Sequence, residues 1–207
     1  MEIGAKSQAL SQSMRSKTRR RIGGIQVCRP YMRADVGLIL SATTFAADKH
    51  RNQRRKDMDA SPYINHPISL ADLLWHEGEV RDAFVIAAAL LHDTIEDTKT
   101  TAAELRRRFG ATVADIVGEV TDNKKLPKER RKELQVEHAA HISKSAKLVK
   151  LADKICNLRD ILASPPADWT IERKREYFDW AKKVIDQIRG TNAKLERRFD
   201  QVYRERP

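Results

Sequence analysis

Residues 87–97, with the sequence AAALLHDTIED, constrain the fold of this chain more than any other segment. The first five residues are apolar, which is typical of a helix in a protein core. His92 follows directly, and three carboxylates follow it, namely Asp93, Glu96 and Asp97. Because an unpaired buried carboxylate carries a large free-energy penalty, such a segment needs a cation at its end. We expect a metal ion there, with His92 and Asp93 among its ligands.

The spacing of these residues is compatible with one shared site. His92 and Asp93 lie about 100° apart around a helix, so both side chains can reach one ion. Glu96 and Asp97 follow Asp93 by three and four residues, which places all three carboxylates on one helix face. A His-Asp pair alone more often marks a capped helix end or a surface hydrogen bond. The apolar run before this pair and the acid pair after it favour the metal site.

Two further residues could complete the site. His66 is followed by Pro67, and proline is favoured in the first turn of a helix. Asp153 interrupts an apolar helical stripe, where a carboxylate needs a partner. That partner is either the metal ion or, in an ordinary ion pair, Lys150 or Lys154.

Together the candidate ligands are two imidazoles and two carboxylates. A mixed nitrogen and oxygen set without thiolates suits manganese, iron or zinc with open coordination positions, and it argues against a closed structural zinc site. The four residues are His66, His92, Asp93 and Asp153.

Apolar residues recur at helical spacing from residue 35 onward, and there is no hairpin signal or convincing run of strands. Thr101 and Glu104 form a capping-box pattern, and Gly110 indicates a helix end. The sequence therefore predicts an all-α fold of about eight to ten helices. We expect helices over residues 35–50, 66–78, 80–96, 101–109, 112–121, 128–139, 145–162 and 170–188, and a last helix after residue 190.

The length of 207 residues and the hydrophobic content of 41% suit one globular domain. No apolar run approaches the roughly 20 residues needed to span a bilayer, and no secretory signal is evident. Cys28 and Cys156 match no paired-cysteine spacing for metal or redox chemistry. A cytoplasmic protein with reduced thiols is therefore expected.

Positive charge is concentrated at the N-terminus. The net charge is +11, and residues 1–31 hold seven lysines or arginines against one acidic residue. Because that stretch lacks helical periodicity, we expect a disordered basic extension over residues 1–31 and one domain over residues 32–207. A nucleic-acid- or membrane-contacting arm and a transit peptide are the alternatives. The basic charge of the remaining chain favours an anionic substrate.

Three motifs carry a resemblance to a known family, namely YINHP at residues 63–67, LHDTIED at residues 91–97 and LADKICNL at residues 151–158. Over residues 35–199 the chain resembles the metal-dependent HD hydrolases of the RelA/SpoT homologue group, above all the small, hydrolase-only alarmone hydrolases. The order His, His-Asp, Asp is generic to the HD superfamily. The HDxxED extension, the Arg-Lys loop before His66 and the asparagine after Asp153 are far more specific.

The resemblance implies a single all-α HD domain that removes the 3′-pyrophosphate from guanosine tetra- or pentaphosphate, giving GDP or GTP. It implies that Glu96 and Asp97 position and activate the attacking water. Two acids this close can titrate as a coupled pair, so neither is assigned as the base. It also implies one Mn²⁺, or another divalent metal, held by His66, His92, Asp93 and Asp153.

The resemblance also indicates substrate-binding residues. Arg55 would contact the purine and Lys56 a phosphate, although a solvated charge run is the usual explanation for such residues. Asn157 suits a ribose hydroxyl or a metal-bound oxygen, where a helix-surface amide is the alternative. Three weaker candidates, which also suit ordinary surface or core positions, are Lys128, Lys147 and Tyr177.

Other functions are compatible with the same residues. The site could hydrolyse another phosphorylated nucleotide, such as the 2′-phosphate of NADPH, or the protein could bind an alarmone without catalysis. The intact Glu96-Asp97 pair argues against a silent module, which need not keep both acids. Residues 57–61 form a longer loop than in the large bifunctional members, whose synthetase and regulatory domains are not found in this sequence. An oligomer is compatible with the sequence, and the preferred alarmone is left open.

Overall fold

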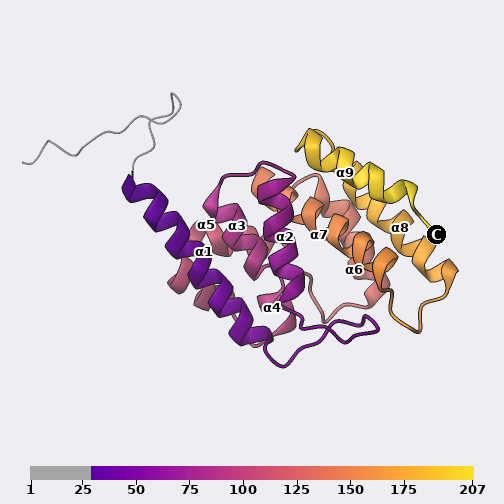
Figure 1. Ribbon diagram of the computed structural model, residues 1–207, viewed down its shortest axis with the longest axis horizontal. Coiled ribbons are helices and arrows are strands. Elements are labelled where there is room, and N and C mark those ends of the chain that lie inside the picture. Colours follow the sequence, from indigo (N-terminus) through magenta and orange to yellow (C-terminus); the bar gives the residue numbers. More distant parts are fainter. Residues whose placement is uncertain (1–28) are drawn as a thin grey trace, which may run out of the picture. The chain divides into compact units, whose positions relative to one another are not determined.

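The computed structural model describes residues 29–207. Nine helices and no β-strand form in this part of the chain, which confirms the predicted all-α class (Figure 1). Residues 37–207 form one compact unit. The helices are α1 (Arg29–His50), α2 (Asn65–His76), α3 (Ala83–Leu91), α4 (Thr94–Asp97), α5 (Ala102–Val120), α6 (Lys128–Ala139), α7 (Lys144–Ala163), α8 (Ile171–Asp186) and α9 (Ala193–Arg204).

Of the expected N-terminal extension over residues 1–31, residues 1–28 lie outside the described part of the chain. Helix α1 begins at Arg29, before the predicted start at residue 35. Over residues 29–207, no helix is both long and apolar enough to cross a membrane.

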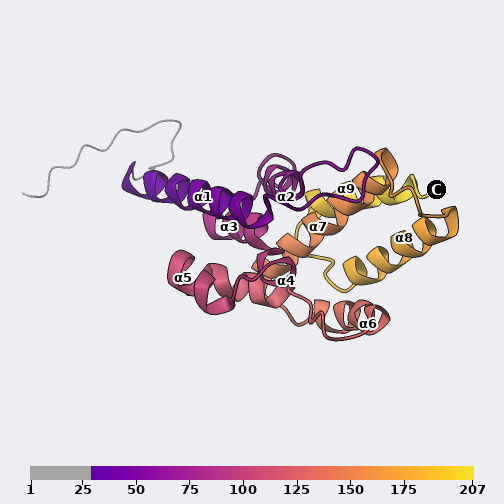
Figure 2. The same ribbon diagram turned by 90° about the horizontal axis from the view of Figure 1, so that it is seen from below.

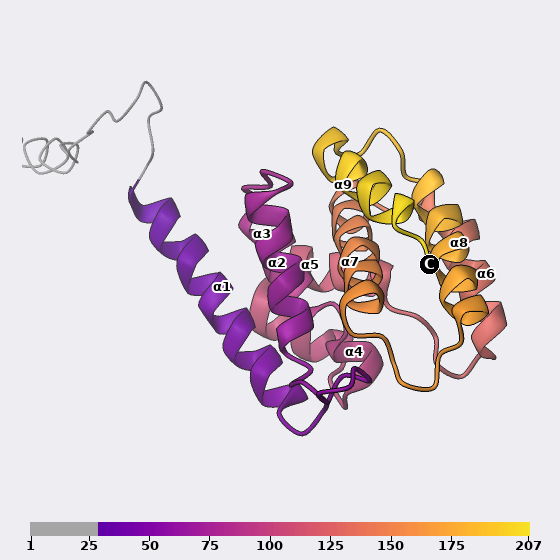
Figure 3. The same ribbon diagram turned by 45° about the vertical axis from the view of Figure 1, so that its right-hand side comes forward.

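Helix α7 is the central packing element of residues 37–207. It packs against α2, α3, α5, α8 and α9, and Figures 1 and 3 show it between α2 and the C-terminal helices. Leu151, Ile155 and Leu158 on its predicted apolar stripe are fully buried. Each such side chain contributes roughly 1.5–3 kcal/mol of hydrophobic stabilisation. The core therefore holds α7 firmly, together with the polar residues Asp153 and Asn157 that it carries.

The predicted continuous helix over residues 80–96 is wrong, because α3 ends at Leu91 and α4 starts at Thr94. His92 Nδ1 lies 2.8 Å from the Ala89 carbonyl oxygen, and the Thr94 hydroxyl donates to the Leu91 carbonyl at 2.6 Å. These side chains satisfy carbonyl groups that backbone N–H groups would bond in a continuous helix. The His-Asp pair therefore occupies a junction between two helices.

Most helix ends follow their sequence signals. The hydroxyl groups of Thr101, Ser143 and Thr170 each accept a hydrogen bond from a backbone N–H of the following helix. The capping box at Thr101 is only half formed. The Glu104 carboxylate forms an ion pair with Lys49 of α1, with 3.3 Å between Oε1 and Nζ. This ion pair takes the place of the return hydrogen bond from the Thr101 backbone N–H to Glu104.

Helix α5 consists of two helical segments that meet at Gly110, as the sequence predicts. Gly110 has φ 86° and ψ 171°, a conformation that residues with a Cβ rarely adopt. No atom lies within 4 Å of the place where a Cβ would sit. Backbone conformation, rather than lack of space, therefore requires glycine here.

Helix α6 is highly charged, and its buried residue is Ala139. It packs against α8, and Figure 2 shows the two helices beside each other. The indole N–H of Trp180 donates to the Lys132 carbonyl at 3.0 Å, which ties α8 to α6. Both helices contribute residues to the wall of the cavity that contains the candidate site.

Truncation of Leu91 should destabilise the fold strongly, because its side chain is fully buried at the end of α3. We expect Leu91→Ala to lower the free energy of unfolding by about 2–5 kcal/mol, through lost burial and the cavity left behind. Leu40 is 62% exposed and provides a matched control. Leu40→Ala should change the free energy of unfolding by less than about 0.5 kcal/mol. Urea unfolding followed by circular dichroism measures both, and equal losses would contradict this assignment of the core.

Candidate active site

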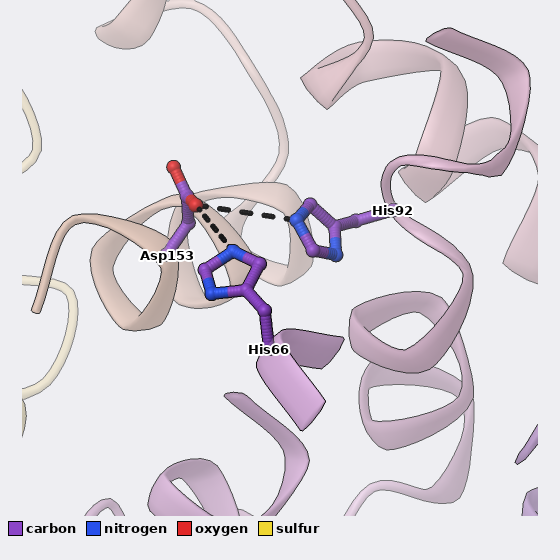
Figure 4. Close-up of side chains that lie close together, drawn as sticks. All are labelled: His66, His92 and Asp153. Atoms are coloured by element: carbon purple, nitrogen blue, oxygen red, sulfur yellow. Dashed lines mark ion pairs between the residues drawn. The ribbon is translucent and has the colours of Figure 1, made fainter. Parts of the chain in front are cut away.

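Three of the predicted metal ligands, His66, His92 and Asp153, converge in space. One donor atom of each lies within 4.8 Å of the other two. Asp153 Oδ1 is 3.3 Å from His66 Nε2 and 3.9 Å from His92 Nε2 (Figure 4). The three residues come from the first turn of α2, the residue after α3 and the middle of α7. Both imidazoles are buried, so the cluster lies at the edge of the core.

The orientation of His92 makes Nε2 the nitrogen that faces the cluster and can bind a cation. A carbonyl oxygen can only accept, so Nδ1 of His92 carries the hydrogen that is shared with Ala89. Nε2 is buried without a hydrogen-bond partner, although Asp93 Oδ2 lies 2.9 Å away. Burial lowers the pKa of His92, but the Asp93 carboxylate outweighs this effect and raises the pKa to about 9. Nε2 therefore holds a proton at neutral pH in the absence of a metal, and a divalent cation would take the place of that proton.

Asp93, the fourth predicted ligand, contacts the cluster through His92. Its Oδ2 also accepts a hydrogen bond from the Tyr63 hydroxyl at 2.6 Å. Burial raises the pKa of Asp93, but the neighbouring His92 outweighs this effect and holds the pKa well below its usual range. Asp93 is therefore an anion at neutral pH.

Asp153 pairs with a lysine through one oxygen and faces the other candidate metal ligands through the second. Its Oδ2 forms an ion pair with Lys154 Nζ at 3.0 Å. Its Oδ1 faces the two histidines and accepts a hydrogen bond from Asn157 Nδ2 at 2.6 Å. Burial raises the pKa of Asp153, but Lys154 and the histidines hold it well below its usual range. Lys150, the other candidate partner, is buried and lines the cavity.

The acid pair lies on the short helix α4. Glu96 Oε2 accepts a hydrogen bond from the Asp122 backbone N–H at 3.0 Å, and Oε1 lies 3.7 Å from the Arg131 guanidinium. Burial raises the pKa of Glu96 to about 7, against the hydrogen bond from Asp122, which lowers it. Glu96 can therefore gain or lose a proton near neutral pH.

Asp97 shares Lys124 with Glu96, whose Oε1 lies 3.9 Å from Lys124 Nζ, but its other partners are its own. Its Oδ2 lies 3.0 Å from the Tyr63 hydroxyl, and its Oδ1 is paired with Lys124 Nζ. The Gln53 side-chain amide donates to the Asp97 backbone carbonyl at 2.7 Å. Three donors thus hold Asp97, two from the segment between α1 and α2 and one from the loop between α5 and α6.

A cavity of about 520 Å³ contains the His66, His92 and Asp153 cluster and the acid pair. Several lysines and arginines line the wall around these acids, which favours a polyanionic ligand. The predicted substrate residues on the wall are Arg55, Lys56, Lys128, Asn157 and Tyr177. Further cations on it are Lys124, Arg131, Lys132, Lys150, Lys154 and Arg173.

Lys147 is the predicted substrate residue that does not line this cavity. Its ammonium group donates to the Ala140 carbonyl at 2.8 Å. Lys147 precedes Asp153 by six residues, which turns its side chain by about 120° around the helix axis from that of Asp153. The geometry gives no support to a substrate-binding role for Lys147.

Arg55 connects the loop before α2 to α7. Its guanidinium donates to Asp160 Oδ2 at 2.5 Å and to Asn157 Oδ1 at 3.3 Å. It also lies over the ring of Tyr63, 5.8 Å from the ring centroid. The two residues that the sequence assigned to purine and ribose contacts, Arg55 and Asn157, are therefore neighbours.

Sequence reasoning missed several polar residues of the site. Tyr63 belongs to the YINHP motif, and its position three residues before His66 is a signal that its hydroxyl lies near the site. Lys124 and Arg131 carried no such signal, because each lies in a charged segment that resembles ordinary surface. Only their contacts with the acid pair distinguish them.

Comparisons with known proteins agree with the motifs and the geometry. A family model of the HD domain matches residues 42–179. The guanosine-3′,5′-bis(diphosphate) 3′-pyrophosphohydrolase MESH1 of Danio rerio is 56% identical over 173 residues, which cover 84% of this chain and 96% of that protein. The enzyme of the same name from Homo sapiens is 51% identical over 175 residues, covering 84% and 98%.

A solved structure of a metazoan ortholog of SpoT, described as hydrolysing ppGpp and acting in starvation responses, is also similar. Its TM-score is 0.79 at 48% identity, and the match covers 82% of this chain and 95% of that one. The resemblance inferred from the three motifs is thereby confirmed. This chain belongs to the HD-domain family and, within it, to the MESH1 family of guanosine-3′,5′-bis(diphosphate) 3′-pyrophosphohydrolases.

Proposed function

We propose that this protein hydrolyses guanosine 3′,5′-bis(diphosphate), and its pentaphosphate analogue, to GDP or GTP and pyrophosphate. The observation that carries this proposal is the meeting of the His66, His92 and Asp153 cluster with Glu96 and Asp97 in one cation-lined cavity. Similarity to enzymes of this activity over more than four-fifths of the chain supports it. The reaction removes the 3′-pyrophosphate and thereby lowers the alarmone concentration.

The HD fold implies a divalent metal, and we propose Mn²⁺ held by His66, His92, Asp93 and Asp153. The two imidazoles and two carboxylates suit a borderline cation of this kind. A metal bound there would lower the pKa of a coordinated water and neutralise charge on phosphate oxygens. His92 would bind the metal through Nε2, after loss of the proton there, because its Nδ1 hydrogen is held by the Ala89 carbonyl.

Glu96 and Asp97 are proposed to orient the attacking water and to take its proton. The raised pKa of Glu96, about 7, suits a group that exchanges a proton at neutral pH. The Tyr63 hydroxyl and Lys124 hold the Asp97 carboxylate in a fixed orientation. Because the two acids are neighbours, they are expected to titrate together.

The cationic wall is proposed to bind the substrate. Arg55 lies beside Asn157, where a guanidinium can stack on a purine while the amide meets a ribose hydroxyl. Lys56 and Lys128 supply charge for phosphate groups, and Tyr177 offers an aromatic wall. We also propose a cytoplasmic location, in keeping with the free thiol of the buried Cys156.

Metal-dependent turnover of ppGpp is the direct test of this function. The purified protein with Mn²⁺ should release GDP and pyrophosphate, and chelation with EDTA should abolish the reaction until Mn²⁺ is restored. His92→Ala and Asp93→Ala should remove activity without unfolding the protein, because each takes away a metal ligand. His141→Ala, which changes an exposed histidine, is the control and should leave turnover unchanged.

Other outcomes of this assay distinguish the alternatives. Cleavage of the 2′-phosphate of NADPH with no turnover of ppGpp would refute the proposed substrate but not the proposed active site. Tight binding of ppGpp without turnover of either nucleotide would identify a binding module.

The acid pair should be separable from the metal site. Glu96→Gln/Asp97→Asn removes both carboxylates but leaves the four proposed ligands in place. We expect turnover to fall by about 10²–10⁴-fold, the range for loss of general acid–base catalysis. Binding of Mn²⁺, followed by electron paramagnetic resonance of the free ion, should change far less. Substantial turnover in this variant would exclude the proposed role of the pair.

The raised pKa of Glu96 should appear in the stability of the metal-free protein. The ordinary pKa of this group is 4.5, and burial raises it to about 7 in the folded state. Between these values the unfolded chain has lost the proton that the folded protein keeps, so stability falls as pH rises. Glu96→Gln removes this effect and should be more stable than the parent protein at pH 8, with a smaller difference near pH 5.

Thermal unfolding in EDTA measures this difference. Glu129→Gln, which changes an exposed glutamate of α6, is the matched control and should show no comparable pH dependence. A constant difference between Glu96→Gln and the parent protein from pH 5 to pH 8 would contradict the raised pKa.

A further inference from the structure

The hydroxyl group of Tyr63 lies between a proposed metal ligand and a proposed catalytic acid. It is 2.6 Å from Asp93 Oδ2 and 3.0 Å from Asp97 Oδ2. Both distances are within hydrogen-bond range, and the shorter one is typical of a hydroxyl that donates to a carboxylate. One side chain therefore touches both halves of the site.

The protein holds Tyr63 on several sides. Its backbone N–H donates to the Gln53 carbonyl at 3.1 Å, and its carbonyl accepts from the His66 N–H at 3.1 Å. Its ring stacks on the buried ring of His50, with 4.8 Å between centroids and 24° between planes. The hydroxyl position is thus set by the backbone of two neighbouring segments and by an aromatic stack.

Gln53 extends this connection to the backbone of the acid pair. Its side-chain oxygen lies 2.6 Å from His50 Nδ1, and its amide nitrogen donates to the Asp97 carbonyl at 2.7 Å. The loop after α1 therefore holds Asp97 at two places, at the main chain through Gln53 and at the carboxylate through Tyr63. This loop fixes where the end of α4 lies relative to His66.

The chemistry of a phenol suits the link between two anions. A hydroxyl has one hydrogen, which it can direct to either carboxylate or share between the two, whereas two ionised carboxylates alone repel each other. A phenol with its ordinary pKa of about 10 is protonated at neutral pH and can therefore donate. Without this hydroxyl, both carboxylates would lose the donor that they share.

We propose that Tyr63 is a positioning residue that fixes the Asp97 carboxylate relative to the metal ligand Asp93. Its hydroxyl orients Asp93 toward the cation site and Asp97 toward the same side of the cavity. Its effect on rate rests on the proposed function, whereas its effect on metal affinity does not. Tyr63 contacts neither the metal nor the reacting atoms in this role.

Tyr63→Phe tests this role, because it removes the hydroxyl and keeps the ring that stacks on His50. Outer-shell partners of metal ligands typically change metal affinity or activity by about 10–100-fold. We expect Mn²⁺ affinity, measured by electron paramagnetic resonance, to weaken by about 10-fold. At saturating Mn²⁺, kcat for ppGpp should fall by about 10–100-fold, while KM stays nearly unchanged.

Tyr203→Phe is the matched control. Its hydroxyl also donates to a carboxylate, Asp179, at 2.9 Å, but it lies outside the cavity. This variant should keep the Mn²⁺ affinity, kcat and KM of the parent protein. An equal loss in the two variants would show a general effect on folding and would overturn the proposal.

A double-variant comparison separates positioning of Asp97 from direct catalysis. If Tyr63 acts through Asp97, adding Tyr63→Phe to Asp97→Asn should lower kcat little further. A full multiplicative loss, or a change in KM alone, would instead indicate direct contact with the substrate and overturn the proposal. If ppGpp is not a substrate, Mn²⁺ affinity still tests the proposal. An unchanged affinity in Tyr63→Phe would show that the hydroxyl does not position Asp93.

Discussion

The neutralisation of carboxylates at the edge of an apolar core is the interaction on which this structure depends. Asp93 and Asp153 are held as anions in spite of burial, because imidazole and ammonium groups surround them. A buried charge without such partners would cost more than the adjacent helices could offset. Lys154 supplies one of these cations, and its ammonium group also lies 4.3 Å from the centroid of the Trp180 ring. The electrostatics of the site thereby depend on the packing of α8.

The need to neutralise these carboxylates also explains the break between α3 and α4. A continuous helix would direct His92 and Glu96 along one helix face, whereas the junction lets His92 bond the Ala89 carbonyl and present Nε2 to the cluster. Helix α4 then carries Glu96 to the backbone of Asp122. The two acids of the pair thus acquire different surroundings although they are adjacent in sequence, and a site with one poised and one firmly held carboxylate suits hydrolysis of a phosphate.

Residue type and spacing predicted part of this arrangement, and physical reasons account for the rest. His92 and Asp153 could be identified because each places a metal-binding group where an apolar pattern predicts burial, and His66 because the proline after it marks a helix start. Lys147 could not be separated from the true cavity residues by charge alone, although its six-residue offset from Asp153 places it elsewhere on α7. Tyr63 was part of a recognised motif, but a phenol between two carboxylates becomes visible only when the loop after α1 meets α4.

By itself, the sequence determined the all-α class, most helix ends, the family and the set of residues able to hold a divalent cation. These properties follow from local rules, since helical periodicity, capping and ligand chemistry are carried by residues close together in the chain. Tertiary structure alone decided which oxygen of Asp153 faces the histidines, how Glu96 acquires a pKa of about 7 and which lysines reach the acids. Those outcomes depend on burial and on distances of a few ångströms between segments up to about a hundred residues apart, which no local pattern specifies.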